Sequence, residues 1–534
     1  MKWWLQFLII FLVGLVVFFP TLELSFYGDD WLVFWRYDSF FPSSQVSNVL
    51  DYLNHFLTRY GSQDMLMGLL RSIYGYNPTY YYLFSLILRI LAAFSLYPLT
   101  FYLTKNKLAT FFAVLFFSVT TIGLETTEYL PHITSYVGLA FFNLFLYFFL
   151  SSREEKESKK LLYSGIFFFL VFVIVPIRMT GLLPFIILIE TFWIIQNLNG
   201  KIFKKFAVRL SFILLIFLFI NIVGNPFFFP SPGRESQSNL FLINQTTHSL
   251  FNMLEQLKNG RFDFLFYPII SFGSMFIPDT TLAYSQDTKL LILSLVGGLI
   301  ILLGFYLLFK FYRNNFVSTA IFISLSWSIL AFFVPWFWDP TYLLISYHRY
   351  LIGSAVGISL FLAIIISLAK SPKHQKIILS LFFFLLLIHI ANTSMYIKKL
   401  QENRNQEISR KIWSQIPYIS AVGQSDEPLV FYFEGDGTND SILHNTVTFG
   451  FPFHMAILYG ITDENRNPIS MIEWKDVASA VLDGKSFAPH AKGKVLDPIS
   501  SERVYAFRLQ GKDNLVNITD VSRKKLIELV QNEQ

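Results

Sequence analysis

The 534-residue chain contains no cysteine, which excludes disulfide bonds and thiolate metal sites. Charged residues are also scarce: they make up 15% of the chain, whereas about a quarter is usual for a soluble domain. Apolar residues take their place, since 54% of the chain is hydrophobic, Phe alone occurs 61 times, and the mean hydropathy is +0.49. This composition predicts a polytopic, all-α membrane protein.

Long apolar runs recur along the chain, and a membrane helix needs about 20 such residues, or fewer when its ends lie in the interface. By this rule the runs predict about eleven transmembrane helices. No small-residue cleavage site follows the first run, so we expect a retained helix rather than a signal peptide. The predicted helices cover 3–19, 80–103, 108–123, 133–151, 162–177, 181–196, 207–224, 289–309, 316–334, 350–369 and 376–393.

Lysine and arginine cluster in the short loops between alternate spans, which is the pattern of cytoplasmic loops. The N-terminus is then cytoplasmic and the C-terminus extracytoplasmic. These clusters account for the net charge of +6, which does not indicate nucleic acid as a partner. We expect a multi-pass protein of the cell membrane, either a plasma membrane or a bacterial inner membrane. The clusters contain Lys105 and Lys107; Arg153 to Lys160; Lys201, Lys204, Lys205 and Arg209; Lys310 and Arg313; and Lys370 to Lys376.

The composition changes near residue 395, where Asp, Glu, Asn, Gly and Lys replace the apolar runs. We therefore predict a transmembrane domain over 1–395 and a small extracytoplasmic α/β domain over 396–534. Within that tail, 427–434 and 504–509 are typical of strands. The long loop 225–288 lies between two spans and begins with a stretch rich in Pro and Gly that suits a mobile lid.

Polar side chains gather in the loops opposite the basic clusters. The first are two adjacent carboxylates, Asp29 and Asp30, at the far end of the first span. Like charges side by side at a membrane boundary raise the free energy unless a function uses them. The others are Glu125, Glu128 and His132 between the third and fourth spans, Arg178 between the fifth and sixth, and His348, Arg349 and Tyr350 at the tenth.

Each of these residues alone is more often an interfacial anchor than a catalyst, and Trp or Tyr at such positions usually forms an aromatic belt. His389, within an apolar span, is expected to be a packed core histidine. Together, however, the set suits one class of chemistry. A carboxylate can deprotonate or orient an acceptor hydroxyl, while arginines bind a phosphate leaving group and stabilise its developing charge. At a membrane boundary, this favours sugar transfer from a polyprenyl-phosphate donor.

Four segments resemble the GT-C class of integral-membrane glycosyltransferases, in particular the branch with protein O-mannosyltransferases and bacterial transferases that use polyprenyl-phosphate sugars. The order and spacing of the segments carry the resemblance, which covers about residues 1–395. Two departures are a Thr120-Thr121 pair in place of His-Pro, and Met179 in place of a Glu. The four segments are Gly28-Asp29-Asp30-Trp31; 82–91 with 113–118 and Glu125; 178–184; and His348-Arg349-Tyr350-Leu351 with 354–357.

The resemblance implies a transferase that uses a dolichyl- or undecaprenyl-phosphate sugar and inverts the anomeric carbon. Asp29 would be the base or the acceptor-orienting carboxylate, with Asp30 as its partner and second choice. Arg349 and Arg178 would bind the donor phosphate with help from His348. Glu125 would assist binding of the acceptor or the sugar. The expected substrate-binding residues are Glu125, Glu128, His132, Arg178, His348, Arg349 and Tyr350.

No metal or other cofactor is assigned, because a hard cation needs more oxygen ligands than one Asp pair supplies. The expected partners are membrane lipid, the lipid-linked sugar donor, and a protein, lipid or glycan acceptor.

Three alternatives remain open. A transporter or flippase also carries charge in the membrane, but it usually has an inverted repeat and charges at the midplane, and the sequence shows neither. A ligase or phosphotransferase of whole lipid-linked glycans needs a similar basic cavity, and the sequence distinguishes it poorly. A catalytically inactive scaffold with the same fold is kept open by the missing His-Pro pair and by Met179.

Overall fold

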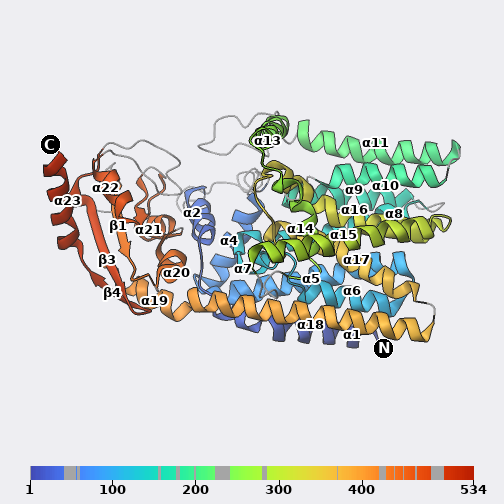
Figure 1. The fold of residues 1–534 in the computed structure, drawn as a ribbon, viewed down its shortest axis with the longest axis horizontal. Coiled ribbons are helices and arrows are strands. Elements are labelled where there is room, and N and C mark those ends of the chain that lie inside the picture. Colours follow the sequence, from blue (N-terminus) through green and yellow to red (C-terminus); the bar gives the residue numbers. More distant parts are fainter. Residues whose placement is uncertain are drawn as a thin grey trace.

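The computed structural model consists of a bundle of helices with a sheet domain at one end (Figure 1). The sheet domain carries the C-terminus at its far edge, and the N-terminus lies at the opposite end of the bundle. The described residues are 2–40, 56, 61–153, 158–175, 181–197, 200–222, 241–278, 285–369, 371–419, 428–437, 439–448, 450–463, 466–482 and 498–533.

A helix lies over each apolar run that the sequence predicts as a span. Within the described ranges, 7 helices are long and apolar enough to cross a membrane, and α6 and α10 are apolar but shorter. The total number of spans stays a prediction. The bundle helices are α1 (Trp3–Phe18), α5 (Pro78–Thr104), α6 (Lys107–Val119), α8 (Thr134–Ser151), α9 (Ser158–Ile174), α10 (Leu182–Gln196), α11 (Gly200–Ile222), α15 (Gln286–Lys310), α16 (Asn315–Trp338), α17 (Ile352–Leu368) and α18 (Pro372–Asn403).

Shorter elements connect these helices on the side of the sheet domain. Five of those described are α-helices that follow α1, α6 or α11 in the chain, and the remainder are single 3-10 turns. The loop 225–288, predicted as a cover for the site, is described from residue 241 onward and contains two of these helices. The elements are η1 (Phe19–Glu23), α2 (Asp29–Phe40), α4 (Gly61–Tyr74), α7 (Glu125–Glu128), η2 (Leu130–His132), α13 (Phe241–Lys258), η3 (Asp263–Leu265), α14 (Tyr267–Ser274) and η5 (Arg349–Leu351).

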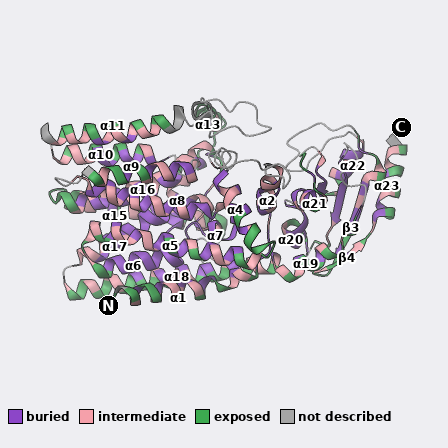
Figure 2. Cartoon of the chain, turned by 180° about the vertical axis from the view of Figure 1, so that it is seen from behind, coloured by how far each residue is buried: buried purple, intermediate pink, exposed green. Residues whose placement is uncertain are grey.

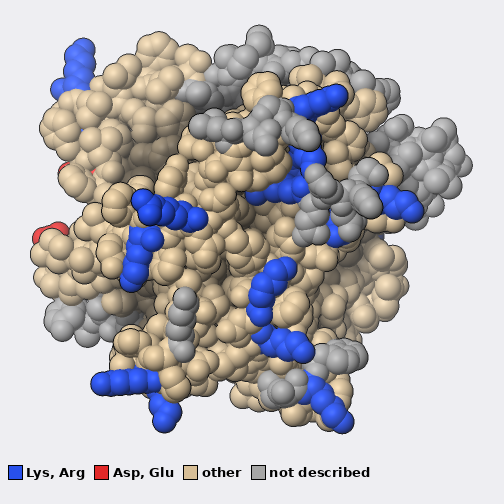
Figure 3. Space-filling model, turned by 90° about the vertical axis from the view of Figure 1, so that its right-hand side faces the viewer, with Lys and Arg blue, Asp and Glu red and all other residues tan. Residues whose placement is uncertain are grey.

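The other set of connections, including the α5–α6, α15–α16 and α17–α18 loops, lies at the end of the bundle away from the sheet domain (Figure 1). Figure 3 views the molecule from that end and shows many Lys and Arg side chains among few acidic ones. The basic loops of the sequence thus share one end of the bundle. This asymmetry of charge is the pattern by which membrane proteins are oriented.

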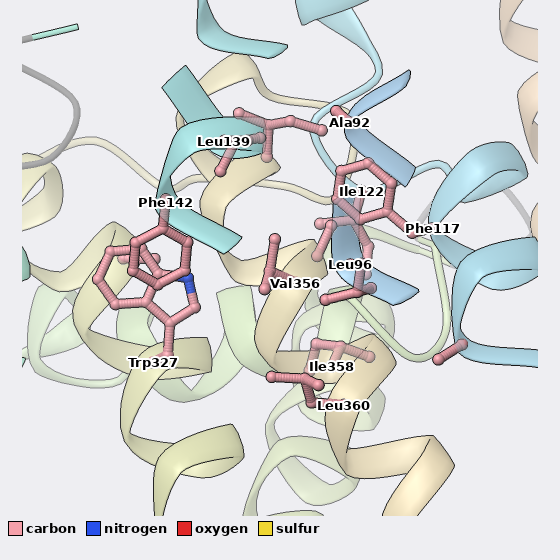
Figure 4. Packing of buried hydrophobic residues seen from close by; sticks show 14 of the residues in the cluster. Ala92, Leu96, Phe117, Ile122, Leu139, Phe142, Trp327, Val356, Ile358 and Leu360 are labelled. Atoms are coloured by element: carbon pink, nitrogen blue, oxygen red, sulfur yellow. The ribbon is translucent and has the colours of Figure 1, made fainter. Parts of the chain in front are cut away.

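Aromatic side chains fill the core where α8, α16 and α17 meet (Figure 4). Phe142 stacks on Trp327 with ring centroids 4.2 Å apart. Helices α16 and α17 approach closely, because a Cβ at Gly357 would lie 2.4 Å from the Ser328 hydroxyl. In lipid, helix association depends on such packing rather than on removal of apolar surface from water. Buried residues accordingly run through the middle of the bundle, with exposed residues on its outer helices (Figure 2).

The sheet domain contains four strands in the order β2-β1-β3-β4, in which β1 pairs in parallel with β2 and β3, and β3 pairs antiparallel with β4. The predicted strands at 427–434 and 504–509 are confirmed as β1 and β3. The elements are α19 (Gln406–Ser414), β1 (Val430–Glu434), α20 (Asp440–Leu443), a π-helical turn at His444–Thr448, α21 (Phe451–Tyr459), β2 (Ile469–Met471), α22 (Trp474–Leu482), η8 (Ser501–Arg503), β3 (Val504–Gln510), β4 (Asn514–Asn517) and α23 (Thr519–Glu533).

Side chains alternate along β1, as the pleat of a strand requires. Phe431 and Phe433 pack with α21 on one face, and Val430 and Tyr432 pack with α22 on the other. Because both of its faces are covered, β1 is almost wholly buried. The sheet domain therefore has hydrophobic packing of its own in addition to its contacts with the bundle.

The bundle and the sheet domain meet on α2. The Trp31 ring stacks on the His454 ring of α21, with centroids 3.8 Å apart and an angle of 4° between the planes. The residues before α2 take part as well, since Leu24 forms an antiparallel bridge with Asn405. The sheet domain is thus seated on the helix that begins with the predicted acid pair.

Gly123 is required by the turn after α6. Its φ is +68°, and a Cβ at this position would lie 2.4 Å from the Ile352 Cα. Alanine needs a left-handed backbone and a displacement of α17, which together cost about 2–4 kcal/mol. We expect Gly123→Ala to lower the thermal unfolding midpoint in detergent. Gly298→Ala is the matched control, because nothing lies within 4 Å of its Cβ; equal midpoints for the two variants would contradict this packing.

Candidate active site

Three connections meet at the end of the bundle nearest the sheet domain: the first turn of α2, the segment with α7 and η2, and the turn η5. Arg178 lies outside the described residues, and so does the stretch 225–233 predicted as a lid. The predicted site residues that the structure describes in these three connections are Asp29, Asp30, Glu125, Glu128, His132, His348, Arg349 and Tyr350.

Buried polar contacts fix the connection from which the two glutamates project. The fully buried Arg89 guanidinium donates to Thr120 O (2.5 Å), just after α6, and to Thr127 Oγ1 (2.9 Å). The carbonyls at a helix C-terminus lack intrahelical donors and favour a nearby cation. Arg89 therefore stabilises this turn both by its hydrogen bonds and by its charge. Thr121 N donates to Nδ1 of His389 at 3.2 Å. The expected core histidine therefore packs against the Thr pair that stands in place of His-Pro.

Glu125 and Arg349 are joined by backbone and side chain. Glu125 Oε2 accepts from the Arg349 backbone N–H (3.2 Å) and lies 3.5 Å from Arg349 Nη1. In return, Glu125 N donates to Tyr347 O at 2.9 Å. The segment with α7 and the turn η5 thus hydrogen-bond to each other in both directions. The Arg349 side chain, held by these contacts, is 30% exposed.

Tyr129 stands between Arg349 and Asp29. The Arg349 guanidinium carbon lies 4.9 Å from the centre of the Tyr129 ring, a cation–π contact. Burial, together with the nearby Asp29 carboxylate, raises the pKa of Tyr129 above its ordinary value. His132 stacks on the same ring with centroids 4.9 Å apart. The result is a line of groups in the order Asp29, Tyr129, Arg349 and Glu125.

Asp30, next to Asp29 in the sequence, is fully buried. Its Oδ2 accepts from Tyr27 N (2.8 Å), and its Oδ1 accepts from Leu130 N (3.2 Å). Burial raises the pKa of Asp30 to about 7, and the nearby Arg404 opposes the rise. Both carboxylate oxygens are therefore engaged by backbone at the start of α2, whereas Asp29 is only partly buried. The structure gives the two adjacent acids different tasks.

Arg404, in the turn between α18 and α19, is the buried cation beside Asp30. Its Nη2 donates to the Tyr82 hydroxyl (2.9 Å) and to Glu128 O (3.1 Å). The guanidinium carbon also lies 4.7 Å from the centre of the Tyr27 ring. One side chain from the entrance of the sheet domain thus reaches α5, α7 and the residues before α2.

Glu128 is a second buried acid of this cluster. Among the described residues, neither carboxyl oxygen has a hydrogen-bond partner. Burial raises the pKa of Glu128 well above its ordinary value, and Arg404 opposes this in part. The raised pKa favours the protonated form of the side chain, which can donate one hydrogen bond.

His348 caps the turn η5, because its Nδ1 accepts from Tyr350 N at 3.3 Å. Its ring lies 5.1 Å from the Tyr350 ring and 5.5 Å from that of Tyr342, measured between centroids. These contacts hold the backbone of Arg349 and leave the histidine outside the line from Asp29 to Glu125. Its observed role is therefore positional.

A small pocket opens beside Arg349, between α8, α16 and α17. Its walls are mostly apolar, and Arg349 Nε is buried beside it without a hydrogen-bond partner among the described residues. Within the same described ranges, no group of three His, Asp or Glu side chains is close enough to hold a metal ion. The lining residues are Ser135, Leu139, Ala331, Pro335, Arg349, Tyr350, Ile352 and Gly353.

No protein-family model matches the chain, and no curated protein sequence is significantly similar to it. Solved structures of the archaeal oligosaccharyltransferase AglB from Archaeoglobus fulgidus are similar. The complex with an inhibitory peptide and a dolichol-phosphate is 12% identical, with a TM-score of 0.45, over 95% of this chain and 70% of that one. The complex with Zn and sulfate is also 12% identical, with a TM-score of 0.46, over 94% and 67%. Likeness at this level assigns no function.

Two residues of the site were not found from the sequence. Tyr129 lies inside the quoted polar segment, but its ring could equally have belonged to the aromatic belt. Arg404 is one basic residue of a polar stretch that also contains Lys398, Lys399 and Arg410. No periodicity distinguishes the buried cation from its exposed neighbours, so only the fold reveals it.

The raised pKa of Glu128 predicts how the stability of the protein depends on pH. Because its folded pKa is raised, the stabilising contribution is full below the ordinary value of 4.5 and is lost as pH rises through the folded value. Glu128→Gln lacks this loss, so its thermal unfolding midpoint relative to wild type should rise between about pH 5 and pH 8. Glu402→Gln, at an exposed position, is the control, and its unfolding midpoint should differ from that of wild type by the same amount at each pH. A falling difference for Glu128→Gln would mean that the acid is ionised when folded.

Proposed function

We propose that the chain is an integral-membrane glycosyltransferase that moves a sugar from a polyprenyl-phosphate donor to an acceptor at the membrane surface. The observation that carries the proposal is a partly open carboxylate, Asp29, and a guanidinium, Arg349, on either side of one Tyr129 ring. An apolar pocket adjoins the guanidinium. These are the groups that an acceptor hydroxyl, a phosphate and a lipid tail require at one place.

In the proposed reaction, the Asp29 carboxylate takes the proton of the acceptor nucleophile as it attacks the anomeric carbon. The bond from that carbon to the phosphate oxygen breaks, and polyprenyl phosphate leaves with the negative charge. Arg349 stabilises this charge as it develops, which is where a fixed cation lowers the barrier most. Attack from the side opposite the phosphate inverts the anomeric configuration. The motif resemblance of the sequence supports the same reaction.

The remaining residues support these two. Glu125 holds Arg349 by backbone and side chain, and Asp30 fixes the start of α2 through two backbone N–H groups. For Arg178 we keep the proposal that it is a second phosphate ligand. The charge asymmetry of the bundle favours an extracytoplasmic location for the site and the sheet domain, with the N-terminus in the cytoplasm. The identity of the sugar and of the acceptor is an outcome of the experiment.

Asp29→Asn should abolish sugar transfer with little loss of stability, because the amide keeps the shape of the side chain but cannot accept the proton. We expect the turnover to fall by about 100- to 10,000-fold, the range of general-base catalysis. The measurement is release of sugar from a panel of radiolabelled polyprenyl-phosphate sugars by purified protein in lipid. Glu402→Gln is the control. Wild-type activity in Asp29→Asn would remove Asp29 as the base and leave Asp30 as the candidate.

Arg349→Gln tests the role of the cation. Loss of a charge-stabilising donor should lower turnover by about 100-fold or more, and Arg349→Lys should restore part of it because it keeps the charge without the planar fork. The readout is turnover and donor KM in the same assay. Arg313→Gln, at an exposed position on the opposite end of the bundle, serves as control. An unchanged turnover with a normal KM would require another residue to bind the phosphate.

A further inference from the structure

The chain passes from the bundle into the sheet domain through the turn between α18 and α19. The backbone of this turn pairs with the residues before α2. Arg404 O accepts from Ser25 N at 2.7 Å. The neighbouring Asn405 forms the isolated bridge to Leu24. Any displacement of the entrance to the sheet domain is therefore passed directly to the backbone that leads to Asp29.

The Arg404 guanidinium adds three contacts to this backbone pairing. Nη2 donates to Tyr82 and Glu128, as described above, and lies 3.4 Å from Ser25 O. The whole residue is 4% exposed, and Nε has no hydrogen-bond partner among the described residues. A buried cation of this kind needs hydrogen-bond acceptors and acids close around it. Asp30 and Glu128 are the acids that act on it.

The sheet domain also contacts the first turn of α2 directly. The ring centroids of Trp413 in α19 and His454 lie 3.9 Å apart, and the His454 ring itself stacks on Trp31. Gly450 comes so close that a Cβ there would lie 2.6 Å from Trp31 Cδ1 and 3.0 Å from Gly28 O. The first attachment contacts Leu24, Ser25 and Tyr27, and the second contacts Gly28 and Trp31, so both hold the short segment that leads into α2.

We propose that Arg404 is a positioning residue: through it, seating of the sheet domain sets the Asp29 carboxylate in line with Tyr129 and Arg349. The inference rests on the proposed function for its consequence in catalysis, but its structural part stands on the contacts alone. Arg404 touches neither the acceptor nor the phosphate in this scheme. It acts through Ser25 O and the Tyr27 ring, which lie just before the helix that carries Asp29. Asp30 fixes the start of that helix through two backbone contacts.

Two consequences separate positioning from general stability. First, without Arg404 the Asp30 carboxylate is held less firmly. The amides that donate to it, Tyr27 N and Leu130 N, then become more open to solvent. Second, loss of the guanidinium raises the pKa of Asp30 further, because Arg404 lowers it in the native protein. The other titratable groups around Asp30 are Asp29 on its own helix and the phenols Tyr27, Tyr82 and Tyr129.

The test compares Arg404→Gln and Arg404→Lys with Arg410→Gln, an exposed arginine of α19. Hydrogen exchange read by mass spectrometry needs no substrate. In Arg404→Gln we expect exchange at least 10-fold faster in peptides covering 24–31 and 125–132, with α16 and α17 unchanged. Arg404→Lys should lie between this variant and wild type, and Arg410→Gln should match wild type. Unchanged exchange in both peptides, or equally faster exchange throughout the bundle, would overturn the proposal.

The second arm measures donor consumption in the same proteins. Arg404→Gln should lower turnover by at least 10-fold with a donor KM within about 3-fold of wild type, and the acid limb of its pH profile should move to higher pH. A raised KM with normal turnover would overturn the positioning role. If wild type consumes no donor, the proposed function fails while the exchange arm still decides whether Arg404 orders the segment.

Discussion

The arrangement at the end of the bundle depends on one buried charge, the guanidinium of Arg404. Taking such a group out of water is costly, and the cost is offset only where carbonyls, a hydroxyl and acids surround it in fixed positions. Those partners come from the residues before α2, from α5 and from α7. The cation therefore requires that segments distant in sequence meet in one way, and the acid pair is aligned as a consequence.

The same principle recurs deeper in the bundle. Arg89 is fully buried and satisfies carbonyls around the end of α6, and Glu190 accepts from Arg153 and Arg209 at 2.9 Å each. In these clusters the polar groups serve helix ends and helix pairs: Arg89 and Glu190 are fully buried, and the Arg153 side chain is 12% exposed. The cluster at Asp29 differs because its outer members, Asp29 and Arg349, are only partly buried. Partial exposure beside fully buried support is what distinguishes a site for chemistry from a structural ion pair.

Much of this could be predicted from the sequence, because the responsible signals are local. Apolar runs mark the bundle helices, alternation marks β1 and β3, and the adjacent charges Asp29 and Asp30 mark the site. The division of labour within the pair could not be predicted, since it follows from which carboxylate meets the backbone of Leu130, 100 residues away in sequence. Arg404 was missed for the same reason: its burial is decided by tertiary contacts, and its local sequence is that of a solvated linker.

The pairing of Asp29 with Asp30 is explained by two demands that one side chain cannot meet. A carboxylate that fixes a helix start must commit both oxygens to backbone donors and accept burial, which raises its pKa to about 7 here. A carboxylate in the proposed role of base must keep an oxygen accessible to the acceptor. Adjacent positions at the first turn of α2 project in different directions, so two acids in sequence place one carboxylate in each environment. The like-charge repulsion between them is reduced because burial raises the pKa of the inner acid, Asp30, and so disfavours its ionisation.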